Sequence, residues 1–334
     1  MKISDCIDAG TEYCPCSLAE TGECIMCSQL QGKVFCDCTN WKGVCIYQEY
    51  IWNHSQSKEN RQVYRCRILA KEAVSPAVTV FTIQVKRTLA RELKEPGAYV
   101  FLRIPDYPTF FDLPMSIMSA DERAGVIKIA VQERGVKTKY LLQREAGRRE
   151  EQQREEVLLR GPYWNGILGL KYLKSFQKGK ALVVVRGIGQ APALPVAKKL
   201  LQGGNEVEVL LDRGRIAVDF TGDLFRKMGC RVLEKQLLKR EDLTLTEETL
   251  AYLQDSLLNK GVGLIYGGGS DLLHQGLSRL IQEVERGVFF VCSNNAQLCC
   301  GEGICGSCQT RLADGSRVKR CKTQLAALNI YEGR

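Results

Sequence analysis

A group of four cysteines near the C-terminus constrains the fold more than any other feature of this sequence. Cys300, Cys305 and Cys308 form a C-x4-C-x2-C run with glycines between them, and Cys321 follows. Plant-type [2Fe-2S] ligands have this spacing and comprise four thiolates, and glycine lets a loop turn tightly around a cluster. We therefore predict a [2Fe-2S] cluster on these four residues; a zinc site or a disulfide pair is the alternative. A chain with such a cluster moves single electrons, so the rest should contain a donor or an acceptor.

Composition narrows the class of protein. The chain has 334 residues, enough for two or three domains, and 45% of them are apolar. The net charge of +9 has no basic block, which disfavours nucleic-acid binding and is compatible with an acidic protein partner. The first residues lack the apolar region of a signal peptide, and no apolar run is long enough to span a bilayer. We expect a cytoplasmic protein, in which clustered cysteines bind metal rather than form disulfides.

Residues 1–58 are expected to form a small Cys-rich metal-binding unit. Its cysteines are Cys6, Cys14, Cys16, Cys24, Cys27, Cys36, Cys38 and Cys45. Aliphatic residues are few here, so bound metal should replace the missing core. Eight thiols suffice for two four-ligand sites, and zinc and a [4Fe-4S] cluster both accept four thiolates, so the spacing leaves the metal open. A zinc-based DNA-binding module is disfavoured, because basic and aromatic residues between the cysteines are sparse.

Residues 61–166 are predicted to form an antiparallel β-barrel. Several segments rich in β-branched and aromatic residues have the pattern of strands and are punctuated by prolines and glycines. These segments are 63–69, 78–85, 99–104 and 126–131. The mostly charged segment 143–156 is expected to be a solvated helix or a mobile insertion.

From residue 179 onward, expected strands alternate with expected helices. The strands are 181–185, 207–211, 230–233, 262–266 and 289–291, and the helices include 192–201, 247–259 and 271–285. This alternation predicts a doubly wound parallel α/β domain over residues 179–291, with residues 292–334 as the cluster tail. The predicted fold class is therefore multidomain, with one α/β part and one β part.

Two glycine-rich turns follow strands of the α/β domain. Gly187, Gly189 and Pro192 follow the first strand and open a helix, and Gly268 and Gly269 follow a later strand. Ligands bind at the carboxyl edge of a parallel sheet, so together the turns predict a dinucleotide site. An ordinary strand–helix turn is the alternative for each.

The residues after the second strand bear on which dinucleotide binds. Asp212 would take a ribose hydroxyl, as in NAD sites, whereas Arg213 and Arg215 beside it would take a 2′-phosphate. NAD and NADP both stay open. In the barrel, the Ser116 hydroxyl and a helix start near Lys137 and Thr138 are candidates to hold a flavin and its pyrophosphate.

The order of barrel, nucleotide domain and cysteine tail resembles one family. The chain is similar to the electron-transfer subunit of dihydroorotate dehydrogenase, within the ferredoxin-NADP reductase superfamily, and to the small subunits of sulfide dehydrogenase and ferredoxin-linked transhydrogenase. The resemblance covers residues 61–334 and is most specific in the tail. It implies FAD, NAD(P) and [2Fe-2S] cofactors and a partner that is a catalytic subunit or a ferredoxin-like redox protein. Residues 1–58 lie outside the family pattern.

The resemblance assigns roles to individual positions. The family's Arg-Pro-x-Ser flavin motif falls on Leu113–Ser116, so Leu113 replaces the arginine and Ser116 is the implied catalytic residue. The family's Gly-x-Gly-Thr pyrophosphate turn falls on Gly135–Thr138, with Lys137 in place of the second glycine. The implied flavin contacts are Pro114, Met115, Ser116, Gly135, Lys137 and Thr138. The implied nucleotide contacts are Gly187, Gly189, Pro192, Asp212, Gly268 and Gly269, where Gly267–Gly269 replaces the family's Cys-Gly-Pro turn.

Two functions are consistent with these features. The first is an electron-transfer flavoprotein subunit that passes electrons between NAD(P)H, FAD and the cluster, to or from a partner. The second is a non-catalytic binding or assembly module that keeps the fold and metal sites without flavin turnover, which Leu113 and Gly267–Gly269 favour. Cys66 and Cys230 are expected to be buried as small hydrophobic residues, and Cys299 is not expected to be a ligand.

Overall fold

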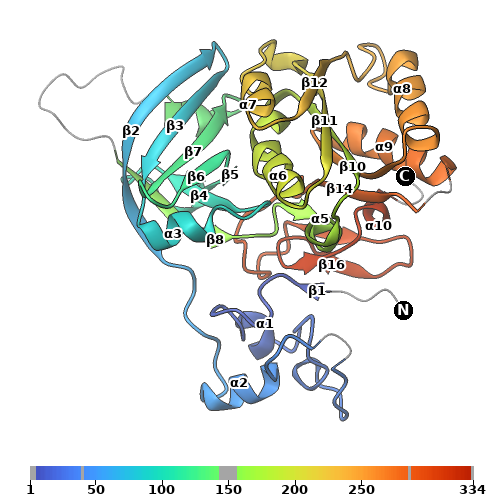
Figure 1. Cartoon of the computed structure of the whole chain (residues 1–334). Coiled ribbons are helices and arrows are strands. Elements are labelled where there is room, and N and C mark those ends of the chain that lie inside the picture. Colours follow the sequence, from blue (N-terminus) through green and yellow to red (C-terminus); the bar gives the residue numbers. More distant parts are fainter. Residues whose placement is uncertain (1–4, 39–40, 143–155, 285–286, 332–334) are drawn as a thin grey trace, which may run out of the picture. The chain divides into compact units, whose positions relative to one another are not determined.

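The structure, a computed structural model, describes residues 5–38, 41–142, 156–284 and 287–331. Packing divides the chain into two compact units. Unit 1 comprises residues 1–62 and 296–325, and unit 2 comprises residues 63–295 and 326–334. The four segments expected from the sequence are thus parts of two units. Figure 1 colours the chain along its sequence, so each segment can be followed there. The charged segment 143–156, apart from Glu156, lies outside the described residues.

Unit 1 joins the Cys-rich segment to the cluster tail. Strand β1 (Asp5–Cys6) pairs antiparallel with β17 (Thr323–Gln324), so the two ends of the chain share one small sheet. The other elements of this unit are α1 (Ser17–Glu20), the 3-10 turn η1 (Gln29–Gln31), α2 (Ile46–Trp52) and the hairpin β15 (Gln309–Arg311) and β16 (Arg317–Lys319). These elements are short, and loops carry most of the cysteines.

The first part of unit 2 is an antiparallel seven-stranded sheet in the order β5-β4-β8-β2-β3-β7-β6. Its strands are β2 (Val63–Ser75), β3 (Val78–Gln84), β4 (Tyr99–Arg103), β5 (Leu113–Ser116), β6 (Ser119–Asp121), β7 (Val126–Gln132) and β8 (Glu156–Tyr163). Strands β5 and β7 contact each other, so the sheet curls into a barrel-like form, as the alternating pattern predicted. Helices α3 (Arg87–Glu92) and α4 (Val136–Leu142) and the turn η2 (Thr109–Phe111) flank it.

The second part of unit 2 is a six-stranded sheet in the order β12-β11-β10-β13-β14-β9. Five of its strands are parallel, and β9 (Ile167–Leu168) is an antiparallel edge. The parallel strands are β10 (Lys180–Arg186), β11 (Glu206–Asp212), β12 (Arg231–Glu234), β13 (Val262–Gly268) and β14 (Phe289–Ser293). This arrangement confirms the predicted doubly wound sheet.

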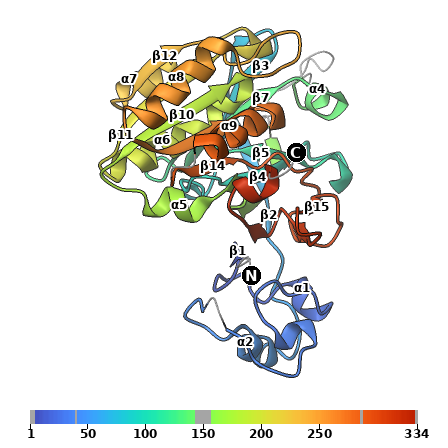
Figure 2. The same ribbon diagram turned by 90° about the vertical axis from the view of Figure 1, so that its right-hand side faces the viewer.

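Helices cover both faces of the parallel sheet (Figures 1 and 2). One group is α5 (Leu170–Ser175), α6 (Gln190–Gln202) and α7 (Gly222–Lys227); the other is α8 (Glu247–Leu258) and α9 (Asp271–Val284), with α10 (Leu328–Tyr331) against α9. The central strand β10 is buried from Ala181 to Val185, which explains its unbroken apolar run. Within the described parts of the chain, no helix is both long and apolar enough to cross a membrane.

Candidate functional site

Strand β5 carries the positions of the flavin motif, and its alternation decides which of them face outward. Leu113 and Met115 pack against the core of the barrel, whereas Pro114 and Ser116 are exposed. The apolar Leu113 therefore fills a core position. The Ser116 hydroxyl lies on the open side of the strand, where a ligand can reach it.

Two arginines lie beside Leu113 that the sequence analysis did not identify. Arg103 Nε is 3.3 Å from Asp112 Oδ1, and Arg160 Nη2 is 3.0 Å from Asp112 Oδ2. The Arg160 guanidinium also lies 4.4 Å from the centre of the Phe101 ring. Because these residues come from β4, β8 and the loop before β5, only the folded sheet brings them together. They place positive charge one residue from the position where the similar family has its arginine.

Thr138 and Lys137 start helix α4 as the sequence predicted, and both are tied to nearby backbone. Thr138 Oγ1 accepts hydrogen bonds from the backbone amides of Arg134 (2.9 Å) and Gly135 (3.1 Å). Lys137 Nζ donates to the Phe110 carbonyl and lies 4.6 Å from the centre of the Phe110 ring. The Lys137 ammonium thus stands beside an aromatic side chain that is 69% exposed, a pairing suited to a phosphate with an attached ring system.

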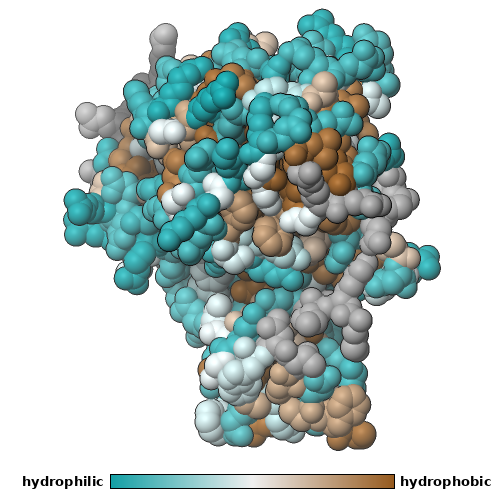
Figure 3. Space-filling model, turned by 45° about the vertical axis from the view of Figure 1, so that its right-hand side comes forward, coloured by the Kyte–Doolittle hydropathy of each residue, from teal (hydrophilic) through white to brown (hydrophobic). Residues whose placement is uncertain are grey.

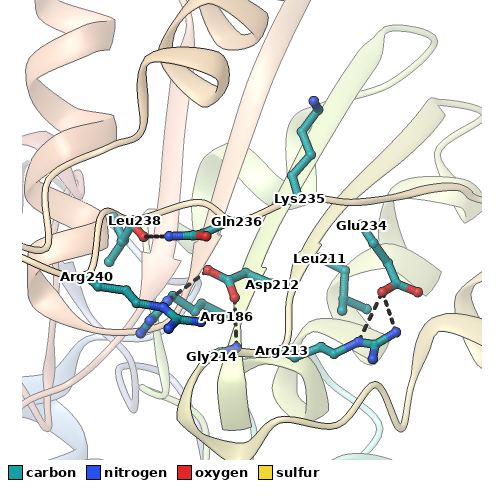
Figure 4. Close-up of a pocket in the computed structure, with 10 residues that line it drawn as sticks. All are labelled: Arg186, Leu211, Asp212, Arg213, Gly214, Glu234, Lys235, Gln236, Leu238 and Arg240. Atoms are coloured by element: carbon teal, nitrogen blue, oxygen red, sulfur yellow. Dashed lines mark hydrogen bonds and ion pairs between the residues drawn. The ribbon is translucent and has the colours of Figure 1, made fainter.

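An open cavity of about 370 Å³ lies at the carboxyl ends of β10, β11 and β12 (Figure 4). Asp212 is nearly buried within it, and three protein donors hold its carboxylate: Arg186 Nε at 2.9 Å, and the backbone amides of Gly214 and Leu237 at 2.8 and 3.0 Å. Asp212, the residue expected to bind a ribose hydroxyl, is therefore fixed in place by its neighbours in the fold.

Basic side chains outnumber acidic ones around this cavity. Arg186, Arg213, Lys235 and Arg240 line it, together with the carboxylates of Asp212 and Glu234. Arg213 Nη2 pairs with Glu234 Oε2 at 2.6 Å, and Figure 4 shows Arg240 extending toward Arg186. Arg215, the other arginine considered from the sequence, is not among the lining residues.

The two glycine-rich turns meet at this same edge of the sheet. A Cβ atom on Gly189 would lie 2.2 Å from the carbonyl oxygen of Gly268, so only glycine allows the turns to approach this closely. Gly187 has a left-handed φ of +59° and open space on its Cβ side. Gly189 and Gly268 thus serve packing, and Gly187 leaves backbone accessible at the start of α6.

A buried polar group lies behind the Gly267–Gly269 turn and was missed from the sequence. His274 is fully buried; its Nδ1 is 3.0 Å from the Tyr331 hydroxyl, and that hydroxyl donates to Asp271 Oδ1 at 2.9 Å. Asn295 Nδ2 donates to the Gly269 carbonyl at 2.7 Å and so holds the turn. The histidine and the tyrosine are 57 residues apart, so no local pattern indicated their contact.

In unit 1, the predicted ligand loop has the backbone that its glycines suggested. Gly301, Gly303 and Gly306 all have left-handed φ angles of +75° to +78°. The backbone amide of Glu302 points at Cys300 Sγ at 3.3 Å, as amides do toward cluster-bound sulfur. Cys308 and Cys321 are buried, while Cys305 and Cys299 are exposed.

The thiols of the four predicted ligands interact with one another. Interaction with the Cys321 thiol lowers the pKa of Cys300 to about 4 and that of Cys308 to about 6, and it raises the pKa of Cys321 itself. Cys305 contributes to the lowered pKa of Cys300 through its backbone and its thiol. These thiol contacts favour the thiolate, the form that binds iron, at Cys300 and Cys308.

A buried group of four charges ties the Cys-rich segment to the cluster tail. Arg61 Nη2 is 2.6 Å from Asp8 Oδ1, and Arg61 Nη1 is 3.0 Å from Glu302 Oε2. Lys322 Nζ is 2.5 Å from Asp8 Oδ2 and 2.7 Å from Glu302 Oε2. Burial alone would raise the pKa of each carboxyl group, but the charges of Lys322 and Arg61 outweigh burial and lower both. Glu302 and Lys322 adjoin predicted ligands, so this group also orders the ligand loop.

In the part of the chain that the structure describes, no three His, Cys, Asp or Glu side chains are arranged around a point where one metal ion would bind. Around a tetrahedral zinc ion, sulfur atoms stand about 3.8 Å apart, given Zn–S bonds of roughly 2.3 Å. A [2Fe-2S] cluster takes its four thiolates from two irons, so its ligands are spread more widely. The choice between a cluster and a single zinc ion on the tail thiols stays a prediction.

No family model matches the chain, but curated relatives do. The electron-transfer subunit of dihydroorotate dehydrogenase B (NAD(+)) from Streptococcus mutans is 23% identical over 249 residues, which cover 72% of this chain and 85% of the relative. The corresponding subunit from Bacillus velezensis is 25% identical over 250 residues, covering 72% of this chain and 88% of the relative.

Solved structures agree on the fold. A chain of the NADH-dependent reduced ferredoxin-NADP oxidoreductase superposes with a TM-score of 0.58 at 18% identity, covering 76% of this chain and 84% of that one. Full-length CYP116B46 from Tepidiphilus thermophilus gives 0.52 at 17% identity, covering 79% and 40%. The chain thus has a ferredoxin-NADP reductase-like fold. Within that class it is similar to the electron-transfer subunits of dihydroorotate dehydrogenase B.

Proposed function

We propose that the chain is an electron-transfer flavoprotein subunit. It passes electrons between NAD(P)H, FAD and a [2Fe-2S] cluster on Cys300, Cys305, Cys308 and Cys321, to or from a partner oxidoreductase subunit. One observation carries this proposal: a fold shared with electron-transfer subunits ends in a loop that gathers four thiols on left-handed glycines. When bound, the flavin exchanges hydride with a nicotinamide and single electrons with a cluster.

Residues of unit 2 have the positions needed to bind and orient these cofactors. Ser116 presents a hydroxyl from the open side of β5, where it would hold a proton near the flavin ring. Lys137, with the cations Arg103 and Arg160, would supply the positive charge that Leu113 lacks. Gly187 would let a diphosphate approach the start of α6. These assignments follow the similar family except for Arg103 and Arg160, which this structure adds.

The charge of the ribose cavity favours a dinucleotide with a 2′-phosphate. Of the four cations that line it, Arg186 pairs with Asp212, Arg213 with Glu234 and Lys235 with Glu248, so Arg240 is the lining cation whose charge no described carboxylate offsets. Asp212 is already held by three donors, which leaves its carboxylate less free for a ribose hydroxyl. We therefore propose NADP(H) in preference to NAD(H). Equal affinity for both nucleotides in equilibrium titrations would contradict this preference.

The exposed surface of the Cys-rich segment supports a docking role. Val34, Phe35, Trp41 and Trp52 are 99, 55, 58 and 69% exposed, and Figure 3 shows hydrophobic side chains gathered on this segment. Exposed aromatic side chains are typical of protein interfaces. We propose that this metal-binding segment docks the chain to its redox partner.

Purification without oxygen, followed by a visible spectrum, tests the proposed function. Flavin bands that bleach on addition of NADPH, beside cluster absorption, are expected. Cluster absorption without flavin would instead favour the second candidate, a non-catalytic binding or assembly module, for which the inward-facing Leu113 is the specific observation.

A pair of cysteine variants tests the cluster ligands. Cys321→Ser should weaken or shift the EPR signal of the reduced [2Fe-2S] cluster, because it replaces a buried thiolate ligand. Cys299→Ser is the matched control, since Cys299 is exposed and adjoins Cys300. A cluster that needs Cys299 and survives loss of Cys300 would refute the assignment.

A further inference from the structure

The eight N-terminal cysteines fall into two halves with nearly the same spacing. Cys6 to Cys24 reads C-x7-C-x-C-x7-C, and Cys27 to Cys45 reads C-x8-C-x-C-x6-C. The match extends beyond cysteine. An aromatic residue precedes each C-x-C pair, and a Gly-x pair precedes the last cysteine of each half. The segment is therefore an internal repeat, and each repeat contains four thiols.

Equivalent glycines of the two halves have equivalent backbone conformations. Gly10 and Gly32, which precede the aromatic residues, have φ angles of +78° and +75°. Gly22 and Gly43, which precede the last cysteines, have φ angles of +72° and +85°. Open space surrounds the Cβ position at Gly22, Gly32 and Gly43, so the left-handed turn itself requires glycine there. The two halves thus bend their chains at matching points.

In the first half, backbone and apolar contacts gather the cysteines. The Cys6 amide donates to Met26 Sδ at 3.2 Å, and Met26, Cys14 and Cys24 all pack against the small apolar cluster of this segment. The Cys14 amide donates to the Thr11 carbonyl at 3.1 Å, which turns the chain before the C-x-C pair. We take Cys6, Cys14, Cys16 and Cys24 as a first set of four.

In the second half, the C-x-C pair has the same place in the repeat. Cys38 Sγ is 3.7 Å from Cys36 Sγ. The Ser28 side chain links the segment at Cys27 to the segment of the C-x-C pair. Its hydroxyl donates to the Phe35 carbonyl at 3.0 Å and accepts from the Asp37 amide at 2.8 Å, which holds the C-x-C pair beside Cys27.

We propose that the repeat holds two four-thiolate metal sites, one on Cys6, Cys14, Cys16 and Cys24, and the other on Cys27, Cys36, Cys38 and Cys45. This inference deepens the metal-binding role given to the segment in the proposed function. Few apolar residues are buried here: Ala19, Cys27, Leu30 and Ile46 form the described core cluster, which is too small to stabilise the segment alone. The sites adjoin in the sequence, where two residues separate Cys24 from Cys27.

Metal analysis of the full-length chain, purified without oxygen, establishes what the sites contain. Two [4Fe-4S] clusters would add roughly eight iron and eight sulfide per chain to the tail cluster, and two single-ion sites would add about two zinc. Either result supports the two sites and identifies the metal. Two zinc ions would also show that binding draws each set of thiols together, since the described thiols do not surround a point where one ion would bind. A chain that retains flavin and the tail cluster but has no further metal would overturn this inference and leave the proposed electron transfer intact.

Paired substitutions test how the thiols are divided. The double variant with Cys14→Ser and Cys16→Ser should lose about half of the N-terminal metal. This loss should be no larger than that of either single variant, because both residues belong to one site. Cys16→Ser combined with Cys38→Ser should lose nearly all of it. Cys66→Ser, at a buried thiol of the barrel, is the control and should lose none. Equal metal loss in both double variants, with the repeat still folded, would refute the division.

A measurement on the unmodified chain covers the case in which a substitution unfolds the whole repeat. Stepwise chelation with simultaneous thiol alkylation, read by mass spectrometry, should label the cysteines in two groups of four, and the members of each group should become reactive together. Groups that mix the two halves would overturn the proposal.

Discussion

The two units of this chain are stabilised in different ways. In unit 2, the barrel alone has a core cluster of seventeen buried residues, and the central strand β10 of the parallel sheet is buried from Ala181 to Val185. In unit 1, the corresponding apolar cluster within residues 5–38 and 41–62 has four members, and the unit also contains a group of four buried charges. Hydrophobic burial dominates unit 2, whereas we propose that unit 1 depends on its ionic contacts and on bound metal.

The largest effect should come from removing metal. Exhaustive chelation of the chain should unfold unit 1 and leave unit 2 folded, because the thiols of unit 1 lose the ligand that holds them together. Limited proteolysis should then cleave within residues 1–62 and spare residues 63–284. Persistent protection of residues 1–62 after complete metal loss would contradict the proposed contrast between the units.

The next largest effect concerns the buried charges. Lys322→Met would leave Asp8 and Glu302 with Arg61 as their remaining described partner in this group, so the opening free energy of unit 1 should fall by about 3–5 kcal/mol. Hydrogen exchange at the Ile7 amide, which donates to the Lys322 carbonyl at 2.9 Å, would report this loss.

Lys319→Ala is the control for that experiment. Its ammonium pairs with Glu23, whose side chain is 56% exposed, so its loss should cost about 1 kcal/mol or less. Similar exchange rates in the two variants would show that burial of the four charges adds no stability.

A smaller effect is expected at the flavin site. Lys137→Ala should raise the Kd for FAD by roughly one to two decades, because a charge-assisted phosphate contact contributes about 1.5–3 kcal/mol. Lys139→Ala, on the same helix, serves as the control. Unchanged flavin content after dialysis would argue against the role of Lys137 and leave Arg103 and Arg160 as the charges that replace the family's arginine.

The sequence predicted unit 2 better than unit 1, for physical reasons. Long apolar runs such as 181–185 report burial directly, so the order of strands and helices agreed with the structure. Strand β2 extended to Ser75, beyond the predicted end, because pairing with β3 stabilises exposed positions that show no apolar pattern. The sequence also predicted tight turns at the glycines of the ligand loop, and each of them has the left-handed backbone that favours glycine.

Contacts between distant segments were not predictable. Arg61 meets Glu302 across 241 residues, and His274 meets Tyr331 across 57, so neither pair leaves a local signal. The repeat of residues 6–45 was present in the sequence, but it emerged once the matching φ angles of its glycines were known. Side chains that act through tertiary contacts were thus the ones missed.

The smallest effect should separate the two nucleotides at the ribose cavity. Arg240 lines that cavity and is exposed, so its contact with a phosphate is partly screened by water. Arg240→Ala should therefore weaken NADPH binding by about tenfold and leave NADH binding nearly unchanged, because the 2′-phosphate is the group that distinguishes them. Lys239→Ala removes a neighbouring charge that pairs with Glu247 outside the cavity, and it should affect neither nucleotide. Isothermal titration of both nucleotides to each variant measures the difference. An equal loss for NADPH and NADH would mean that Arg240 contacts a part common to both, and the cavity would then not select NADP(H).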